Sequence, residues 1–522
     1  MDEREQWFLT PAERGNPDTT IDSRKIDGRA YTEGNEAIPL IHGADYFKRL
    51  YEVISSLERD DWIHFTDWRG DPDQRLVGPG TEVAKVLADA AERGVHVRGL
   101  VWRSHPDQAR FSEQENVHLV ESVNSAGGEV LLDERVRKGG SHHQKLFLIR
   151  HPSDEGRDIA FVGGIDLCYS RKDDEYHRGD EQVYEMSDAY GETPPWHDAQ
   201  LQVRGPAIGD LALTFRERWE DDTPLDRRSP LRLLMMKRAH QPSRRPDPLP
   251  DMPEDPGPVG SQALQVLRTY PFRGLHSYPF ARKGERSIAR AYGKAVARAE
   301  RFIYVEDQYF WSTDVASTVA DELSRKPGLH LIAVVPRYPE QSGLSAHPES
   351  SGQNEALEVL RAAGGDRVAI YDLENEDGTP IYIHAKVCVI DDTWAMVGSD
   401  NLNRRSWTHD SELSCAVLDD ERDPRNPQDP GGNGDGARVF ARDLRLKLWK
   451  EHLQDAFDET AALNPMTGFE LWRDTAGSKR GRIRHHVTPP IPSVHRAWAR
   501  WVYKHMVDPD GRPPGLRRRG EF

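Results

Sequence analysis

The chain has 522 residues, of which 37% are hydrophobic and 30% charged, and its net charge is −17 at pH 7. This length exceeds what one ordinary hydrophobic core organises, so two domains or a pseudo-dimer are expected. The acidic balance argues against a nucleic-acid partner and against loose electrostatic binding to anionic lipid. A basic pocket can still exist within an acidic total.

The location signals in the sequence favour the cytoplasm. No run of about 18 apolar residues occurs, so no transmembrane helix is expected. The first residues, MDEREQWFLTPAERG, are acidic and lack an apolar stretch, unlike a secretory signal peptide. Three cysteines, Cys168, Cys388 and Cys415, show no metal-ligand spacing, which predicts buried free thiols in a reducing compartment.

Helices and strands are predicted to alternate in both halves of the chain. Helical spacing of apolar residues and apolar strand-like runs predict the following order: helix 46–57, strand 62–68, helix 81–93, strand 95–101, helix 288–299, strand 302–310, helix 315–323, strand 329–335, a Gly-rich loop 428–436 and helix 437–455. Near-continuously apolar strands between helices are typical of buried parallel or mixed sheets. We therefore predict an α/β protein.

The composition divides the chain into four segments. A Pro-rich stretch, 241–260, excludes a helix or a central strand and is interpreted as a linker between an N-terminal half, 1–240, and a C-terminal half, 261–460. A basic tail, 461–522, contains Trp498 and Trp501. Two interpretations of this tail remain open: a surface helix with a frayed end, or a contact with a membrane surface.

The tripeptide His-x-Lys occurs twice, as His143-Gln144-Lys145 and His384-Ala385-Lys386, and each copy is followed by an apolar run toward a glycine. Side chains alternate along a strand, so His and Lys of one copy are expected on the same face. Two matching copies indicate a duplicated unit whose imidazoles and ammoniums face each other across a pseudo-twofold axis. One His can attack phosphorus, the other can protonate the leaving oxygen, and the two Lys can hold phosphoryl oxygens.

Further polar residues follow each copy at comparable places. After the second copy come Asp391, Gly398-Ser399 and Asn401, whose amide suits a phosphoryl oxygen. A predicted strand over 408–414 carries Glu412, a carboxylate expected to bind Nδ1 of His384. The corresponding residues of the first half are Gly163-Gly164, Asp166 as a positioning residue, and Asp198 as the expected orienting partner of His143. Candidate substrate-binding residues are thus Asn401, Ser399, Gly164 and Asp166.

On these residues the chain resembles the phospholipase D superfamily, whose motif is His-x-Lys-(x)4-Asp-(x)6-Gly-Ser-x-Asn. The second copy matches every position. The first copy has Arg150 in place of the Asp and six extra residues before its glycines, with Asp154 and Asp158 as alternative carboxylates. The runs 196–198, 205–207 and 305–310 match as well, and Gly-Gly-Ile-Asp-Leu, 163–167, is more similar to the phospholipase branch than to the nuclease branch.

The resemblance implies two similar α/β/α halves packed as a pseudo-dimer, with the active site at their interface. It implies that His143 forms a phosphohistidine while His384 acts as acid and then base, with Lys145 and Lys386 as cations and Asp198 and Glu412 as supporting carboxylates. It also implies no metal and no other cofactor, a phospholipid substrate met peripherally at a membrane surface, no nucleic acid, and a monomer with an internal pseudo-twofold.

The favoured hypothesis is a phospholipase D that releases phosphatidic acid and the head-group alcohol, with transfer to other alcohols as a further outcome. The alternatives are a cardiolipin synthase-like phosphatidyltransferase, a nucleic-acid phosphodiesterase and a non-catalytic scaffold. The acidic charge counts against the nuclease, and the two intact His/Lys pairs count against the scaffold.

Overall fold

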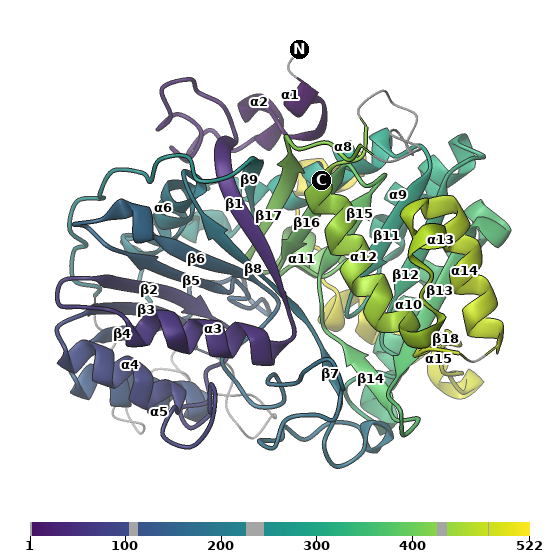
Figure 1. Cartoon of the computed structure of the whole chain (residues 1–522), viewed down its shortest axis with the longest axis horizontal. Coiled ribbons are helices and arrows are strands. Elements are labelled where there is room, and N and C mark those ends of the chain that lie inside the picture. The colour runs from purple at the N-terminus through teal and green to yellow at the C-terminus, as the bar shows by residue number, and fades with distance from the viewer. Residues whose placement is uncertain (1–2, 104–112, 226–244, 425–435, 479) are drawn as a thin grey trace.

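The computed structural model describes residues 3–103, 113–225, 245–424, 436–478 and 480–522 (Figure 1). The first half forms one mixed sheet in the order β4-β3-β2-β5-β6-β8-β1, in which β4, β3 and β2 are parallel and every later pair is antiparallel. The bounds are β1 (Thr32–Ile41), β2 (Trp62–Asp67), β3 (His96–Trp102), β4 (Glu129–Asp133), β5 (Leu146–Arg150), β6 (Ile159–Gly163) and β8 (Ala199–Arg204).

The second half repeats this order strand for strand, as β13-β12-β11-β15-β16-β17-β9, with the same change from parallel to antiparallel pairing. The bounds are β9 (Gln262–Tyr270), β11 (Phe302–Glu306), β12 (His330–Val334), β13 (Val368–Glu374), β15 (Val387–Ile390), β16 (Trp394–Gly398) and β17 (Glu412–Asp419). Strand β1 pairs with β9, which joins the two sheets along the pseudo-twofold. The expected duplication of an α/β unit is confirmed.

Helices cover the outer face of each sheet because their apolar residues recur at helical spacing. Helices α3 (Gly43–Ser55) and α4 (Val83–Glu92) pack on the first sheet, and α8 (Ser287–Arg298), α9 (Thr313–Arg325) and α10 (Ala346–Gly364) pack on the second. A third core runs continuously between the halves and includes α6 (Ala207–Trp219), α12 (Val439–Leu453) and α14 (Pro465–Ser478). The layers are therefore α/β/α in each half, as Figure 1 shows.

Both ends of the chain pack on the second half. The N-terminal helix α1 (Glu3–Trp7) buries Trp7 and Phe8 in the core around α8. Beyond α14, the short strand β18 (Ile483–His485) extends the sheet beside β13, and helix α15 (Ser493–Val502) packs on α10. All three cysteines are buried and unpaired. Within the described ranges, every helix is too short or too polar to cross a bilayer.

One predicted strand is wrong at its start. Residues Arg404–Thr408 form helix α11, and strand β17 begins only at Glu412. The side chain of Asn403 caps this helix by accepting a hydrogen bond from the backbone N–H of Ser406 at 2.8 Å. Such a cap satisfies an N–H that the first helical turn leaves unpaired, and this favours helix over strand here.

Candidate active site

The two His-x-Lys segments lie at equivalent places in the two sheets, immediately before β5 and before β15. The expectation that the motif residues belong to these strands is therefore wrong, because each strand begins at the residue after the motif Lys. Their backbone is nevertheless extended by pairing across the interface. A short strand of the first half, β7 (Trp196–His197), runs parallel to β14 (Pro380–Ile383) of the second half, and His142 forms a parallel bridge with Ser411.

These pairings fix each motif histidine to the opposite half. The backbone N–H of His384 donates to the carbonyl of His197 at 2.7 Å, and that of His143 donates to the carbonyl of Ser411 at 2.9 Å. His197 directly precedes Asp198, and Ser411 directly precedes Glu412. Each histidine is thus held next to the carboxylate of the other half.

The side chains follow the backbone, so the expected pairing of carboxylates with histidines is wrong. Nδ1 of His143 lies 2.8 Å from Glu412, and Nδ1 of His384 lies 2.6 Å from Asp198. The sequence predicts that each carboxylate contacts the histidine of its own half. The structure crosses them, because the residues just before each carboxylate pair with the residues just before the histidine of the other half. With Nδ1 engaged, Nε2 of each ring is left for the substrate.

Glycine allows this close approach on both sides. A Cβ on Gly164 would lie 2.2 Å from Oδ1 of Asp198 and 3.2 Å from the carbonyl oxygen of His384. A Cβ on Gly398 would lie 1.9 Å from Oγ of Ser414. Gly164 therefore acts through its lack of a side chain, which lets Asp198 reach His384.

The electrostatic surroundings of His384 lower its pKa. Burial, followed by the positive charges of Lys386 and Arg171, holds the pKa of His384 well below the usual histidine range. The guanidinium of Arg171 lies 3.9 Å from the ring centroid of Trp196, which in turn packs 4.9 Å from the imidazole of His384. The neutral ring donates its Nδ1–H to Asp198 and presents a lone pair on Nε2. A bound phosphodiester adds negative charge and shifts this ring toward its protonated form.

Lys145 is ion-paired with Asp166 at 3.0 Å, and both side chains are buried. Burial and the charge of Asp166 raise the pKa of Asp67 well above its usual range, and a hydrogen bond joins the two carboxyl groups. Protonated Asp67 donates to Asp166, which keeps its negative charge opposite Lys145. The ion pair with Lys145 offsets the charge of Asp166, and its positioning role stays a prediction.

Among the described residues, no carboxylate forms an ion pair with Lys386 as Asp166 does with Lys145. Its Nζ contacts Oε1 of Gln308 at 3.3 Å and the backbone carbonyl of His384. Burial, and then the charge of Lys145, lower the pKa of Lys386 to about 8. Asn401 replaces Asp166 in this half, so the structure keeps Lys386 more available to a phosphoryl oxygen than Lys145 is.

Ser399 serves Glu412 in this structure. Its hydroxyl donates to Oε2 of Glu412 at 2.6 Å and accepts a hydrogen bond from the backbone N–H of Leu413 at 3.0 Å. Its role in substrate binding stays a prediction. Asn401 is buried beside the site, and its Oδ1 has no hydrogen-bond partner.

The motif Asp of the second copy and the Arg that replaces it in the first copy both make structural contacts. Asp391, the matching residue of the second copy, accepts hydrogen bonds of 2.8–3.0 Å from the backbone N–H groups of residues 300–302, at the start of β11. In the first half Arg150 is paired with Asp158 at 2.5 Å. Both sets of contacts lie at the ends of strands, at the start of β11 in the second half and at the end of β5 in the first. The motif Asp therefore has a structural role that other residues can replace.

Sequence reasoning did not assign roles to Asp67, Arg171 or Gln308. Asp67 is the last residue of β2, and Gln308 follows β11 within the 305–310 run. Their place at the ends of equivalent strands was the available signal. Arg171 lies in the long segment after β6 and has no motif of its own, so only the folded chain reveals its effect on His384.

Comparisons with known proteins agree with this geometry. A phospholipase D family model matches residues 71–334, and a model described as cardiolipin synthase, PLD-like domain, matches residues 294–423. Phospholipase D alpha 1 of Vigna unguiculata is 25% identical over an alignment that covers 80% of this chain and 65% of that protein. The homologue of Cynara cardunculus is 24% identical, with 85% and 67% covered. The chain thus spans about two thirds of the length of these plant relatives.

A solved structure with the same fold is the phosphatidylserine synthase of Haemophilus influenzae Rd KW20, with a TM-score of 0.50, 13% identity, and 74% of this chain and 84% of that chain covered. The first family model spans just over half of the 522 residues. Two equivalent halves, crossed His–carboxylate pairs and these matches lead to one conclusion: the chain belongs to the phospholipase D superfamily of phosphodiesterases.

Proposed function

We propose that the protein is a phospholipase D, which cleaves a phospholipid to phosphatidic acid and the head-group alcohol. The observation that carries the lipid assignment is the similarity to plant phospholipases D over 80–85% of this chain, across both halves. The net charge of −17 supports lipid over nucleic acid, because a nuclease surface is favoured by positive charge. The site itself supplies groups for a phosphodiester: two oriented imidazoles and two ammoniums.

The first step forms a covalent intermediate. Nε2 of His143 attacks phosphorus as the bond from phosphorus to the head-group oxygen breaks, and that oxygen takes a proton from Nε2 of His384. Lys145 and Lys386 bind the two non-bridging oxygens, and each such contact contributes about 2–4 kcal/mol to lowering the barrier. In the second step His384 removes a proton from water, whose oxygen displaces Nε2 of His143 from phosphorus.

A phosphatidyltransferase is the second candidate. It is favoured by the match of residues 294–423 to the cardiolipin synthase, PLD-like domain, model. The chemistry differs only in the second step, in which the hydroxyl of an acceptor alcohol replaces water. The two candidates therefore differ in how the acceptor competes with water for the phosphohistidine.

Turnover of lipids and DNA distinguishes these functions. We expect phosphatidic acid and free head group from phosphatidylcholine or phosphatidylethanolamine vesicles, and no cleavage of single- or double-stranded DNA, with His143→Ala as the inactive control. Added glycerol or phosphatidylglycerol reports transfer through the new phosphodiester, measured by mass spectrometry. Cleavage of DNA with no lipid turnover would contradict the proposal, and transfer in excess of hydrolysis would favour the transferase.

We further propose that the protein acts as a monomer in the cytoplasm and binds a bilayer peripherally through an exposed apolar patch. Val494, Trp498 and Trp501 lie on one face of α15, with the tryptophans 46% and 58% exposed, and Met506 follows. The basic residues Arg496, Arg500 and Lys504 alternate with them in the sequence. Tryptophan with flanking cations is typical of an interfacial helix that lies on anionic lipid. We assign this tail surface to membrane contact.

The patch is connected to the catalytic groups through aromatic packing. Tyr503, directly after α15, lies 6.3 Å from Trp311, and Trp311 stacks on Tyr309 at 3.8 Å. The hydroxyl of Tyr309 accepts a hydrogen bond from Gln308, the residue that contacts Lys386. Buried Tyr503 thus links the end of α15 to the residues that surround Lys386.

Replacing Trp498 and Trp501 together by Ser is expected to lower binding to vesicles that contain phosphatidylglycerol at least about 10-fold, because two large apolar side chains no longer leave water. Sedimentation with vesicles measures this. Turnover of a water-soluble short-chain phosphatidylcholine should stay unchanged. Tyr176→Ser, which removes a 52% exposed aromatic elsewhere, is the matched control. Equal vesicle binding by the double variant would refute the assignment.

A further inference from the structure

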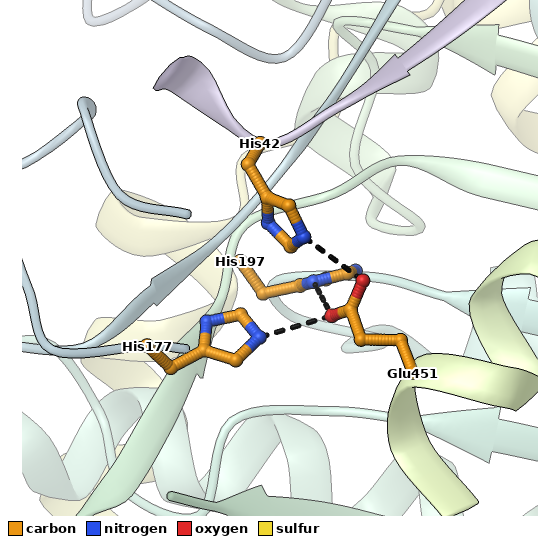
Figure 2. Close-up of side chains that lie close together, drawn as sticks. All are labelled: His42, His177, His197 and Glu451. Carbon is orange, nitrogen blue, oxygen red and sulfur yellow. Dashed lines mark hydrogen bonds and ion pairs between the residues drawn. The ribbon is translucent and has the colours of Figure 1, made fainter. Parts of the chain in front are cut away.

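A second set of imidazoles lies directly behind Asp198, outside the phosphate site. Nε2 of His42 and Nε2 of His177 each lie 2.9 Å from a different oxygen of Glu451, and Nδ1 of His197 lies 3.2 Å from the latter oxygen. All the donor atoms lie within 4.8 Å of one another. Figure 2 shows the three rings directed at one carboxylate.

The four residues come from separate parts of the fold. His42 lies between β1 and α3, His177 in the long segment after β6, and His197 in β7. Glu451 is on α12 of the second half. The side chains of His177 and His197 are fully buried, that of His42 is nearly so, and that of Glu451 is slightly exposed.

The outer nitrogens of two rings already have acceptors. Nδ1 of His177 lies 3.0 Å from the carbonyl oxygen of Trp196, and Nε2 of His197 lies 2.7 Å from the carboxylate of Glu306. Because a carbonyl or carboxylate only accepts, these nitrogens carry hydrogen. A neutral ring then presents its lone pair to Glu451. Lone pairs directed at a carboxylate repel it, unless protons or a cation lie between them.

The carboxylate of Glu306 is itself held by two further hydrogen-bond donors. It accepts hydrogen bonds from Nε2 of His452 at 2.7 Å and from the hydroxyl of Tyr304 at 2.5 Å. A carboxylate that takes the outer N–H of an imidazole, and that is held in turn by other donors, is the arrangement that orients histidines for metals.

The backbone at two of these histidines is held in unfavourable regions. His42 has φ 79° and ψ 151°, a combination almost restricted to glycine, and His177 has φ 54°. A non-glycine residue keeps such a conformation only where the surroundings over-determine it, and such residues concentrate at functional sites. The side chains of His42 and His177 both point at Glu451.

We propose that His42, His177, His197 and Glu451 bind one divalent transition-metal ion of the zinc class. Three imidazoles and one carboxylate suit Zn²⁺, whereas Ca²⁺ and Mg²⁺ require oxygen-rich sets. Ligand atoms in a tetrahedral zinc site lie about 3.3 Å apart, given bonds of about 2.0–2.1 Å. The three imidazole nitrogens lie 2.9–3.2 Å from the oxygens of Glu451, so these contacts need to lengthen by only a few tenths of an ångström. The donor atoms as a set lie within 4.8 Å of one another and need to close toward a common centre.

This site goes beyond the proposed function, because the ion contacts no reacting atom. It connects the halves and immobilises the backbone around Asp198. The backbone N–H of His42 donates to the carbonyl of Asp198 at 2.9 Å, and the carbonyl of His197 accepts from His384 at 2.7 Å. A metal here would fix the carboxylate that orients His384, so its role is structural.

The test is metal binding by the full chain. Protein stripped with a chelator and titrated with Zn²⁺ against a chromophoric competitor should bind one equivalent, release protons and unfold at a higher temperature. Glu451→Gln and His177→Gln should each weaken binding at least about 100-fold, and Glu306→Gln about 10–100-fold. Cobalt titrated into the wild-type chain should give the intense visible bands of a tetrahedral site.

His486→Gln is the matched control, since it alters a buried imidazole 3.2 Å from Asp372, away from the cluster, and should bind one equivalent. Absence of zinc binding by the wild-type chain would overturn the proposal and leave a protonated ion-pair network. Binding unchanged by both Glu451→Gln and His177→Gln would overturn it too. If these variants fail to fold, the wild-type cobalt spectrum decides, and absence of tetrahedral bands refutes the site.

Discussion

His143→Ala is expected to lower kcat for phospholipid hydrolysis by about 10⁴- to 10⁶-fold, the range seen when a covalent nucleophile is removed. His384→Ala should be comparably slow on phospholipid, whose leaving alkoxide needs a proton. The two variants should separate on a phosphodiester with a nitrophenolate leaving group, because that group departs without an acid. His384→Ala should then release one burst of nitrophenolate and accumulate a phosphorylated protein, while His143→Ala releases none.

Intact-mass measurement and peptide mapping identify the modified residue. The expected adduct is on Nε2 of His143, since its Nδ1 is engaged by Glu412 at 2.8 Å. An adduct on His384 in the His143→Ala variant would reverse the two roles. The low pKa of His384 makes this comparison informative, because a neutral ring is a competent nucleophile as well as a base. His96→Ala, a change at a surface histidine, serves as the control for folding.

Asp198→Asn is expected to lower kcat by about 10³- to 10⁴-fold, as happens when the carboxylate behind a catalytic imidazole loses its charge. Because Asp198 contacts His384, the change should alter the ring of His384 and leave that of His143 unaltered. Nitrogen NMR of histidine-labelled protein measures the effect. The Nδ1 proton signal of His384 should move upfield, while that of His143 stays in place.

Glu412→Gln is the reciprocal variant and should move the signal of His143 alone. The residue's other contact, with the Ser399 hydroxyl, can be kept by the amide oxygen. If Asp198→Asn instead altered His143, the halves would pair within themselves and the crossed arrangement would be wrong. The two variants therefore control for each other, since both remove one buried negative charge at equivalent places.

Much of the fold could be predicted because it depends on local periodicity. Helices α3, α4, α8 and α9 lie within a few residues of the predicted ranges, since their buried faces repeat at helical spacing. Strands β2, β3 and β12 were equally clear as apolar runs. The start of β17 was missed because helix α11, which precedes it, begins at a cap that depends on a single hydrogen bond of Asn403.

The proposed zinc site shows a second limit of prediction from sequence. The sequence suggested no metal, because short ligand spacings are what reveal a site in a sequence. His42 and Glu451 are 409 residues apart, and the others lie in different elements. No local pattern relates residues that meet only through the docking of α12 against the first half.

By itself, the sequence determined the duplicated α/β unit, the two His-x-Lys pairs and the phosphoryl chemistry they suit, since spacing along the chain carries that information. Only the tertiary structure decided which carboxylate serves which histidine. Strand β7 pairs with β14, and His142 with Ser411, across the interface. Those contacts form between the halves, so each half completes the catalytic histidine of the other. The tertiary structure likewise decided the low pKa of His384, because burial and the charges of Lys386 and Arg171 act through space.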